Sequence, residues 1–246
     1  MDASRIIAVI PARYQSTRFV GKPLADIGGK SMIQRVYEQA KKAASLAEVI
    51  IATDDSRIEK HAKSLGARVV MTGEQANGTG RCYEAIQKSR EKADFILNIQ
   101  GDEPFILPDQ IDLLCKHLSH STKIATMAKR ITDSNVLFDP NVVKVTFNKL
   151  QRALYFSRSM IPFSRNTQKE ICTEKTFFYK HIGVYAYQYD VLAQLVSLSA
   201  TPLECTESLE QLRWLEHGFD IQIVTTLFES IGIDTPDDIN KVLHLI

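Results

Sequence analysis

The chain has 246 residues, and its 30 Lys and Arg against 29 Asp and Glu give a formal net charge of +1. This length corresponds to one large α/β domain or two small ones, and an apolar fraction of 44% with a charged fraction of 24% is typical of a soluble globular protein. The balanced charge argues against a general nucleic-acid-binding protein, which would carry a basic excess. It is compatible with a small anionic ligand, because a local phosphate site needs only a few cations.

The sequence also argues against secretion, membrane insertion and a disulfide or zinc scaffold. The four cysteines lie far apart and form no CxxC pair, so we expect buried or inert thiols in a reducing compartment. No run approaches the roughly 18 consecutive apolar residues of a membrane span, and the first residues carry no cleavage-site pattern. We therefore expect a cytoplasmic protein with no nucleic acid and no membrane among its partners.

The first part of the chain alternates between apolar runs and amphipathic segments. Strands are predicted at 6–10, 49–52, 68–71 and 95–99, and helices at 32–40 and 58–65. This alternation predicts an α/β fold with a mostly parallel wound sheet and helices on both faces. Polar loops follow the strands, and ligands of such sheets bind beyond the carboxyl ends of the strands. The sequence therefore predicts one crevice at that edge.

The rest of the chain predicts a smaller antiparallel excursion and a return to the main sheet. Strands are expected at 142–147, 153–156, 182–187 and 221–225, and helices at 203–217 and from Asp234 onward. Residues from about 141 to 190 form the excursion, which we interpret as a dimer arm or a substrate lid. The sequence shows neither an internal repeat nor a linker, so we predict a single domain over 1–246.

The loop after the first strand carries the strongest chemical signal. Arg13, Arg18 and Lys22 place three cations within ten residues, and Gly21 beside Lys22 allows close approach of the backbone. Fixed donors with positive charge at the open end of a strand suit a polyphosphate. The pattern is neither the dinucleotide GxGxxG nor the P-loop GxxxxGK[ST]. A solvated basic loop is the alternative, and the position after a buried strand favours phosphate binding.

Two aspartates are candidate metal ligands. Asp102 follows Gln100-Gly101 at the end of a buried strand, where a carboxylate costs desolvation unless it is paired or binds a cation. Because Mg²⁺ accepts one or two carboxylates together with phosphate oxygens, Asp102 is a natural ligand, and a turn cap is the alternative. Asp234 precedes Thr235-Pro236 and is equally consistent with a ligand or with the N-cap of a helix.

Other polar residues stand where a ligand would satisfy them. The segment 77–81 opens a helix, so its backbone amides can face a base or phosphate and Arg81 adds a donor. A lone histidine such as His181 is more often structural than catalytic. Glu210 and Gln211 would be poor core residues in an otherwise apolar helix, which favours a polar ligand beside them.

Taken together, these motifs resemble the sugar nucleotidyltransferases, and within them the cytidylyltransferases that activate acidic sugars. The resemblance extends over nearly the whole chain. It rests on the order of the segments 10–24, 52–55, 77–79, 100–104, 153–158, 180–183, 209–213 and 233–238.

The resemblance implies transfer of CMP from CTP to the anomeric hydroxyl of an acidic eight-carbon sugar, 3-deoxy-D-manno-octulosonate (KDO), with release of pyrophosphate. It implies Mg²⁺ held by Asp102 and Asp234, catalysis by these two with Lys22, a homodimer, and a product used in lipopolysaccharide assembly. The implied nucleotide-binding residues are Ala12, Arg13, Arg18, Lys22, Asn77, Gly78, Arg81 and Gln100. The implied sugar-binding residues are Gln100, Arg158, His181, Tyr185, Glu210 and Gln211.

Gly80 departs from the family's pattern, which usually has an acidic residue between Thr79 and Arg81. The departure removes one negative charge and loosens the start of the helix. The same chemistry on 8-amino-KDO or another acidic sugar is therefore an alternative. A binding module without activity is a second alternative, against which the presence of Lys22, Asp102 and Asp234 argues. The absence of GxGxxG after the first strand argues against a dinucleotide-dependent oxidoreductase.

Overall fold

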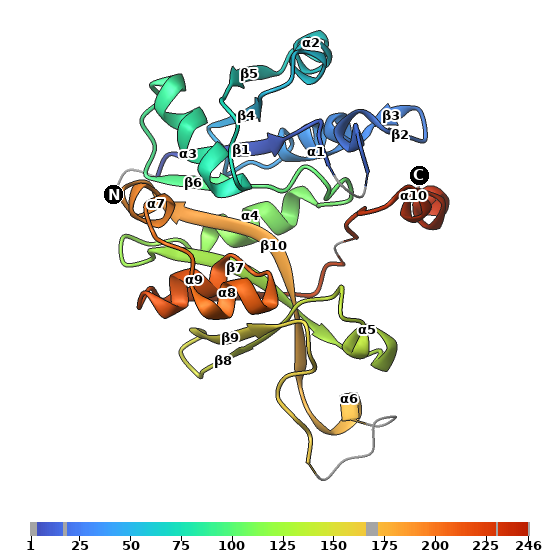
Figure 1. The fold of residues 1–246 in the computed structure, drawn as a ribbon, viewed down its shortest axis with the longest axis vertical. Helices are drawn as coiled ribbons and strands as arrows, with labels where there is room; N and C mark the ends of the chain where they lie inside the picture. The colour runs from blue at the N-terminus through green and yellow to red at the C-terminus, as the bar shows by residue number, and fades with distance from the viewer. Residues whose placement is uncertain (1–3, 17–18, 166–171, 230, 246) are drawn as a thin grey trace. The chain divides into compact units, whose positions relative to one another are not determined.

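The computed structural model describes residues 4–16, 19–165, 172–229 and 231–245. The chain forms two compact units, of which unit 1 comprises Met1–Lys116, Ala186–Val196 and Ser230–Ile246, and unit 2 comprises His117–Tyr185 and Ser197–Glu229 (Figure 1). The single domain that the sequence predicts over 1–246 stays a prediction.

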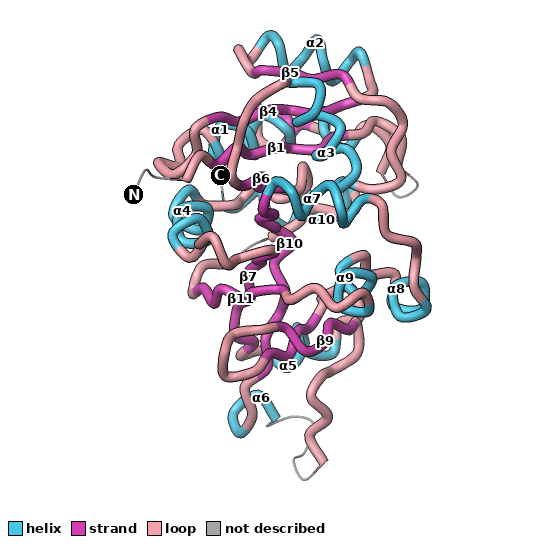
Figure 2. The backbone as a smooth tube through the Cα atoms, turned by 90° about the vertical axis from the view of Figure 1, so that its left-hand side faces the viewer, coloured by secondary structure: helices cyan, strands magenta, loops and turns pink. Residues whose placement is uncertain are grey.

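Unit 1 is built on parallel strands that run side by side (Figure 2). Its elements are β1 (Ile6–Ala12), η1 (Lys22–Leu24), β2 (Asp26–Ile27), β3 (Lys30–Ser31), α1 (Met32–Ala40), β4 (Glu48–Thr53), α2 (Ser56–Ser64), β5 (Arg68–Met71), α3 (Gly78–Ser89), β6 (Phe95–Asn98), α4 (Pro108–Lys116), α7 (Tyr189–Val196), α10 (Pro236–Val242) and η3 (Leu243–Leu245). Strand β1 pairs in parallel with β4 and β6, and β4 pairs with β5. Residues 7–10 of β1 have no exposed surface, because β4 and β6 flank this strand and helices α1 and α3 pack on it. This burial explains the continuous apolar run.

The register of these strands fixes where their loops begin. Ala12 of β1 lies opposite Thr53 of β4, and Val9 of β1 lies opposite Asn98 of β6. The loops after β1, β4 and β6 therefore leave the sheet at one edge, as predicted for the crevice. Helices α1 and α3 both contact β1. The predicted fold class, a mostly parallel sheet with helices around it and smaller antiparallel pairings, is confirmed.

Unit 2 contains most of the antiparallel pairing. Its elements are β7 (Ile124–Ile131), α5 (Ser134–Phe138), β8 (Lys144–Phe147), β9 (Ala153–Ser157), α6 (Cys172–Lys175), β10 (Phe178–Gln188), α8 (Pro202–Glu207), α9 (Gln211–Glu216) and β11 (Ile221–Thr226). Strand β8 pairs antiparallel with β9 and β10, as the predicted excursion requires. Strand β7, which pairs in parallel with β11, was not among the predicted elements. The last residues of β10, 186–188, belong to unit 1.

Two helix predictions differ from the structure. The helix predicted at 203–217 is two helices, α8 and α9, because Ser208 adopts a left-handed conformation with φ 54° and ends α8. Helical spacing of apolar residues persists across this break, so periodicity alone does not reveal it. The helix predicted from Asp234 begins at Pro236, with Thr235 as its N-cap and Asp238 completing a capping box.

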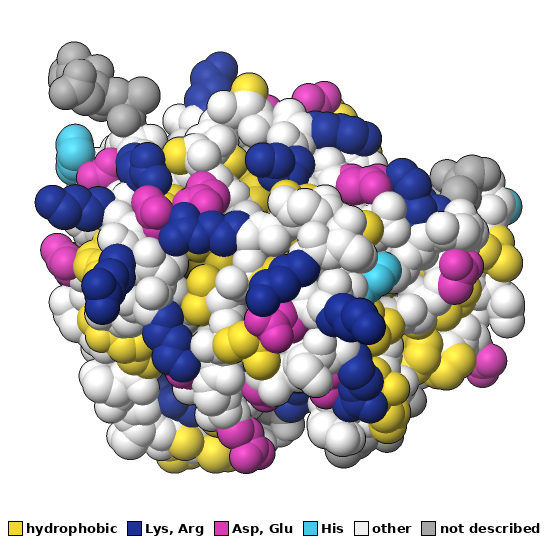
Figure 3. Space-filling model, turned by 90° about the horizontal axis from the view of Figure 1, so that it is seen from above, with side chains coloured by type: hydrophobic (Ala, Val, Ile, Leu, Met, Phe, Trp, Pro, Cys, Tyr) yellow, Lys and Arg dark blue, Asp and Glu magenta, His cyan; other side chains and the backbone are white. Residues whose placement is uncertain are grey.

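Two of the three cysteines whose side chains the structure describes are buried. Cys82 and Cys115 are buried, burial raises the pKa of the Cys115 thiol to about 12, and Cys205 is exposed. Basic and acidic side chains are interspersed on the face drawn in Figure 3. None of the helices in the described residues is long and apolar enough to cross a membrane.

Lys144, at the start of β8, is a lysine with no exposed surface. Its ammonium donates to the carbonyl oxygens of Asp139 at 2.9 Å and Val142 at 2.6 Å, and to the carbonyl oxygen of Arg158. Burial lowers the pKa of Lys144 below its ordinary value. One buried ammonium thus links three backbone positions of unit 2. Without it, each of the three carbonyl oxygens would lose this hydrogen-bond donor.

Replacing Lys144 by Met should destabilise the protein by about 2–3 kcal/mol, because an apolar chain of similar length leaves buried carbonyl groups without donors. Urea unfolding followed by circular dichroism measures this change. The matched control is Lys149→Met, which removes an exposed lysine five residues away and should change stability by less than about 0.5 kcal/mol. Equal effects of the two substitutions would contradict the assigned role of Lys144.

Candidate active site

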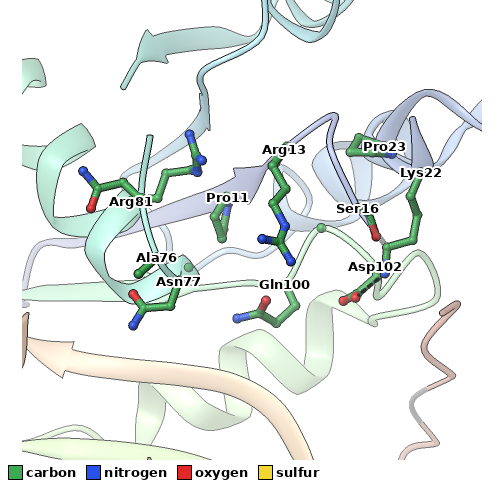
Figure 4. Close-up of a pocket in the computed structure, with 14 residues that line it drawn as sticks. Pro11, Arg13, Ser16, Lys22, Pro23, Ala76, Asn77, Arg81, Gln100 and Asp102 are labelled. Carbon is green, nitrogen blue, oxygen red and sulfur yellow. Dashed lines mark hydrogen bonds and ion pairs between the residues drawn. The ribbon is translucent and has the colours of Figure 1, made fainter. Parts of the chain in front are cut away.

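The loops after the strands of unit 1 surround a cavity of about 320 Å³ (Figure 4). The predicted residues that line it are Ala12, Arg13, Lys22, Asn77, Gly78, Arg81, Gln100 and Asp102. Residues from the loops after β1 and β6 thus meet those that open α3, as the position of these loops at one edge of the sheet predicts. Arg18 lies outside the described residues.

Lys22 forms an ionic junction at one end of this cavity. Its Nζ donates to Asp102 Oδ2 at 2.7 Å, to Asp234 Oδ1 at 3.4 Å and to the carbonyl oxygen of Ile233 at 3.1 Å. The exposed fraction of the side chain is 16% for Lys22, 33% for Asp102 and 48% for Asp234. The structure therefore brings together the three residues that sequence reasoning named as catalytic.

Asp234 is not the N-cap of the last helix, one of the two roles that the sequence left open for it. Thr235 is the N-cap of α10, and the Asp238 carboxylate accepts from the Thr235 amide at 2.9 Å and from the Asp234 amide at 3.2 Å. Hydrogen bonds from Lys241 and Thr235 hold the pKa of Asp238 at about 2. Because Asp238 satisfies the helix start, the Asp234 carboxylate is available to contact Lys22.

Arg13 extends from the end of β1 into the space between Asn77 on one side and Lys22 with Asp102 on the other (Figure 4). Its side chain is exposed, so it can contact a ligand that enters the cavity. Arg13 and Lys22 supply positive charge beside an open cavity, which is the arrangement that binds a polyphosphate.

Asn77 begins α3 as its N-cap, and its side-chain oxygen accepts from the Gly80 amide at 2.8 Å. A Cβ atom at Gly80 would lie 2.7 Å from Gln75 Oε1. The Gln75 amide therefore occupies the space that a side chain at position 80 would need. Gln75 also lines the cavity, and its Nε2 donates to Glu84 at 2.7 Å.

Arg81 lines the cavity, but its guanidinium is bound to the protein. It donates to Thr72 Oγ1 at 2.5 Å and to Asp54 Oδ2 at 2.7 Å, and only 4% of the side chain is exposed. Sequence reasoning treated Arg81 as a free donor. The structure shows a buried guanidinium, paired with the more exposed Asp54 carboxylate, in the first turn of α3.

The predicted sugar-binding residues other than Gln100 belong to unit 2. The His181 ring lies 5.2 Å from the ring of Tyr185 and 5.2 Å from that of Phe156, between ring centroids. Thr126 Oγ1 donates to the Val184 carbonyl oxygen at 2.7 Å, so its contact of 2.9 Å with His181 Nε2 requires the ring to donate. Burial lowers the pKa of His181 to about 3, which makes the ring neutral at pH 7.

Arg158 and the pair Glu210–Gln211 occupy other parts of unit 2. Arg158 Nε donates to the Glu207 carbonyl oxygen at 2.9 Å, while its amide donates to the Glu207 carboxylate at 2.9 Å. Glu210 is the N-cap of α9, and Gln211, its first residue, is buried with 6% exposure. Lys180, which precedes His181 in β10, forms an ion pair with Glu229.

Sequence reasoning missed some residues of the cavity. Ser16, Gln75, Ala76 and Gly101 also line it. The position of Ser16 between Arg13 and Lys22 is a signal that was available, whereas Gln75 stands in a polar loop with no pattern to distinguish it.

This fold with a basic, carboxylate-bearing cavity beyond its parallel strands defines a nucleotidyltransferase. The family model described as "Cytidylyltransferase" matches residues 7–223, and the chain belongs to this family. It is similar over nearly its full length to proteins named 3-deoxy-manno-octulosonate cytidylyltransferase. The enzyme class and the resemblance predicted from the sequence are confirmed.

Two of these relatives illustrate the similarity. The protein from Cytophaga hutchinsonii is 50% identical over 242 residues, which cover 97% of this chain and 96% of that protein. The protein from Parabacteroides distasonis is 51% identical over 248 residues, covering 98% of each. Among solved structures, a CMP:2-keto-3-deoxy-manno-octonic acid synthetase complexed with CTP matches with a TM-score of 0.91 and 42% identity, covering 98% of each chain.

His181 should make folding stability depend on pH in a defined window. Its folded-state pKa of about 3 lies below the ordinary value of 6.5, so the unfolded chain binds the proton first and stability is lost as pH falls from about 6.5 towards 3. His181→Gln should reduce this loss, measured by urea unfolding between pH 7 and pH 4. Parallel pH profiles of the two proteins would contradict the assignment.

Proposed function

We propose that this chain transfers CMP from CTP to the anomeric hydroxyl of KDO and releases pyrophosphate. The observation that carries the proposal is the contact of Lys22 with Asp102 and Asp234 at the cavity of a chain about half identical to relatives named for this reaction. The neutral overall charge agrees with a small anionic substrate that is bound by a local group of cations.

The cavity of unit 1 would hold the nucleotide. Arg13 and Lys22 contact the triphosphate in this proposal. The backbone N–H groups at the N-terminus of α3, at Asn77 and Gly78, face the nucleotide. Arg81 acts indirectly, because its ion pair with Asp54 shapes the wall to which the nucleotide binds. Arg13 and Lys22 also stabilise the negative charge that develops on the leaving pyrophosphate.

The donors at the Lys22 junction fit Mg²⁺. Asp102 and Asp234 already direct carboxylate oxygens at one cation, the Lys22 ammonium, and Mg²⁺ commonly takes one or two carboxylates from a protein alongside substrate phosphate oxygens. We propose that these two aspartates hold it. When bound, the ion would neutralise phosphate charge and lower the pKa of a coordinated hydroxyl.

In the proposed reaction, the anomeric oxygen of the sugar attacks the α-phosphorus in line. A new bond forms between that oxygen and phosphorus, the bond from phosphorus to the bridging oxygen breaks, and pyrophosphate leaves with its electron pair. The hydroxyl proton goes to solvent, and none of the described residues stands out as a dedicated base. His181, with a pKa of about 3, is too weak a base for this step.

The sugar would be recognised by Gln100 and by residues of unit 2. Arg158 is the proposed partner of the sugar carboxylate, and His181 with Tyr185 presents a neutral polar and aromatic surface. Glu210 and Gln211 are the proposed partners of sugar hydroxyls. The product would enter lipopolysaccharide assembly.

We also propose a homodimer in which the excursion over 141–190 takes part. Leu150, Leu154, Phe163 and Phe177 of this segment expose between 60% and 79% of their surface. Several large apolar side chains exposed on one segment favour association with another protein surface.

Pyrophosphate release with CTP and Mg²⁺ tests the proposal directly, with KDO, 8-amino-KDO or N-acetylneuraminate supplied in separate reactions. We expect release with KDO. Lys22→Met and Asp102→Ala should each lower kcat/KM by about 100-fold or more, because Lys22 stabilises the charge on the leaving pyrophosphate and Asp102 is a proposed ligand of Mg²⁺.

The control is Lys30→Met, which removes an exposed lysine paired with Glu38 and should leave kcat/KM unchanged. Release with the amino sugar alone would keep the chemistry and change the substrate. No release with any of the three sugars from folded protein would overturn the proposal.

Gly80→Ala tests the contact between position 80 and Gln75. The new Cβ would displace the Gln75 amide, the end of a flexible side chain, so we expect the KM for CTP to rise about threefold through the altered cavity wall. The free energy of unfolding should stay equal or rise by up to about 1 kcal/mol, because Ala has a higher helix propensity than Gly. Gln87→Ala, towards the other end of α3, is the control and should not change the KM. An unchanged KM for CTP in Gly80→Ala would exclude this role of Gln75.

A further inference from the structure

Strand β4 ends at Thr53 and is followed by Asp54 and Asp55, neither of which contacts substrate in the proposed reaction. Both aspartates lie outside the lining of the cavity, yet each carboxylate is bound by an arginine. Asp54 Oδ2 accepts from Arg81 Nη2 at 2.7 Å, and Asp55 Oδ2 accepts from Arg57 Nη2 at 2.6 Å. Two adjacent carboxylates therefore reach two different elements of unit 1.

The contact of Asp54 with Arg81, the Asp54 arm, reaches the part of the cavity wall that α3 forms. Arg81 lies in the first turn of this helix, with 4% of its side chain exposed, and a second bond of 2.5 Å to Thr72 Oγ1 holds the same guanidinium. A buried guanidinium that is held by a carboxylate and a hydroxyl has one favourable position. The backbone that begins α3, including Asn77 and Gly78, is fixed with it.

The contacts that lead from Asp55 through Arg57 to Tyr14, the Asp55 arm, begin at α2. Asp55 is the N-cap of this helix, and Oδ1 accepts from the Arg57 amide at 2.9 Å and from Arg57 Nε at 3.0 Å. The two carboxylate oxygens thus hold the Nε–Nη2 edge of the guanidinium in a bidentate contact. This planar group lies over the Tyr14 ring, with Arg57 Cζ at 3.3 Å from the ring centroid, which is a cation–π contact.

Tyr14 in turn closes the loop that carries the phosphate-binding cations. Its carbonyl oxygen accepts from the Gly21 amide at 2.8 Å. Gly21 has φ +72°, and a Cβ there would lie 3.1–3.2 Å from atoms of the Tyr14 ring, so only glycine allows this approach. Arg13 precedes Tyr14 and Lys22 follows Gly21, so the Tyr14–Gly21 contact fixes the distance between the two cations.

We propose that Asp54 and Asp55 position the two walls of the nucleotide cavity, Asp54 through Arg81 and Asp55 through Arg57 and Tyr14. Tyr14 and Arg57 are positioning residues for Arg13 and Lys22 and do not touch the substrate. This inference rests on the proposed function, because it assigns the cavity to CTP.

A double-mutant cycle tests the Asp55 arm. Tyr14→Ala should raise the KM for CTP about tenfold and Arg57→Ala about threefold, since a misplaced binding group weakens both binding and positioning. Arg57 acts only through Tyr14, so the double variant should equal Tyr14→Ala. Tyr14→Phe keeps the ring and should stay within about twofold of the wild type. The KM for KDO should not change in any of these variants.

The Asp54 arm should behave independently. Asp54→Asn should raise the KM for CTP about threefold, and combined with Tyr14→Ala the two effects should multiply, because the arms share no side chain. The matched control is Arg68→Ala, which removes a guanidinium paired with Glu48 and Glu91 in the same unit and should leave the KM unchanged.

Hydrogen exchange of the Gly21 amide tests the arm without any substrate. Its bond to the Tyr14 carbonyl should open more often in Tyr14→Ala and Arg57→Ala, and exchange should be at least several-fold faster than in the wild type or in Arg68→Ala. If Tyr14→Ala does not fold, Asp55→Asn keeps the helix cap and should give the same direction of change.

The outcomes separate this inference from the proposed function. A wild-type protein that fails to use CTP overturns the proposed function, whereas the exchange of the Gly21 amide still reports on the arm. Unchanged exchange in both variants, or effects of Arg57→Ala and Tyr14→Ala on the KM that multiply, would overturn the positioning role.

Discussion

The ammonium of Lys22 lies between the carboxylates of Asp102 and Asp234, and the candidate site depends on this contact. The three residues belong to distant parts of the sequence. The parallel pairing of β1 with β6 brings the first two loops to one edge of the sheet. The third is held by Ile233, whose amide donates to the Asp102 carbonyl oxygen at 2.9 Å and whose side chain is buried with Ile27, Met32 and Val242. The burial of Ile233 in this apolar cluster therefore positions the next residue, Asp234, so that its carboxylate contacts Lys22.

The charge of this junction suits the proposed chemistry. One ammonium and two carboxylates sum to a formal charge of −1, which alone would repel a triphosphate. A divalent cation held there, as we propose, would change the sum to +1 and make the site attractive to an anion. The half-exposed Asp234 side chain leaves room for such a change, whereas the Arg81 guanidinium that pairs with Asp54 is buried, with 4% of its side chain exposed. The cavity thus combines one fixed ion pair with one that a ligand can rearrange.

Sequence patterns predicted the parts of this molecule that depend on local order. The buried strands follow from continuous apolar runs, and Lys22 and Asp102 follow from their positions in the polar loops after such strands. Patterns did not predict the partners of Arg81, because ion pairs between distant segments leave no mark in spacing. They did not distinguish a cap from a ligand at Asp234, since Thr235 forms an equally good cap. They also missed the break at Ser208, where a single left-handed residue interrupts an otherwise continuous helical pattern.

The two aspartates that follow β4 contact two different parts of the cavity wall, because the backbone that carries them is extended. Successive side chains of an extended segment point to opposite sides, and Asp55 keeps such a conformation with φ −116° and ψ 125°. Asp54 can therefore reach Arg81 of α3 while Asp55 faces Arg57 of α2 and, through it, Tyr14. The two arginines lie on different helices, Arg57 on α2 and Arg81 on α3, and each has its own carboxylate. Two adjacent acidic residues at this point are thus the shortest sequence that fixes both the start of α3 and the loop between Arg13 and Lys22.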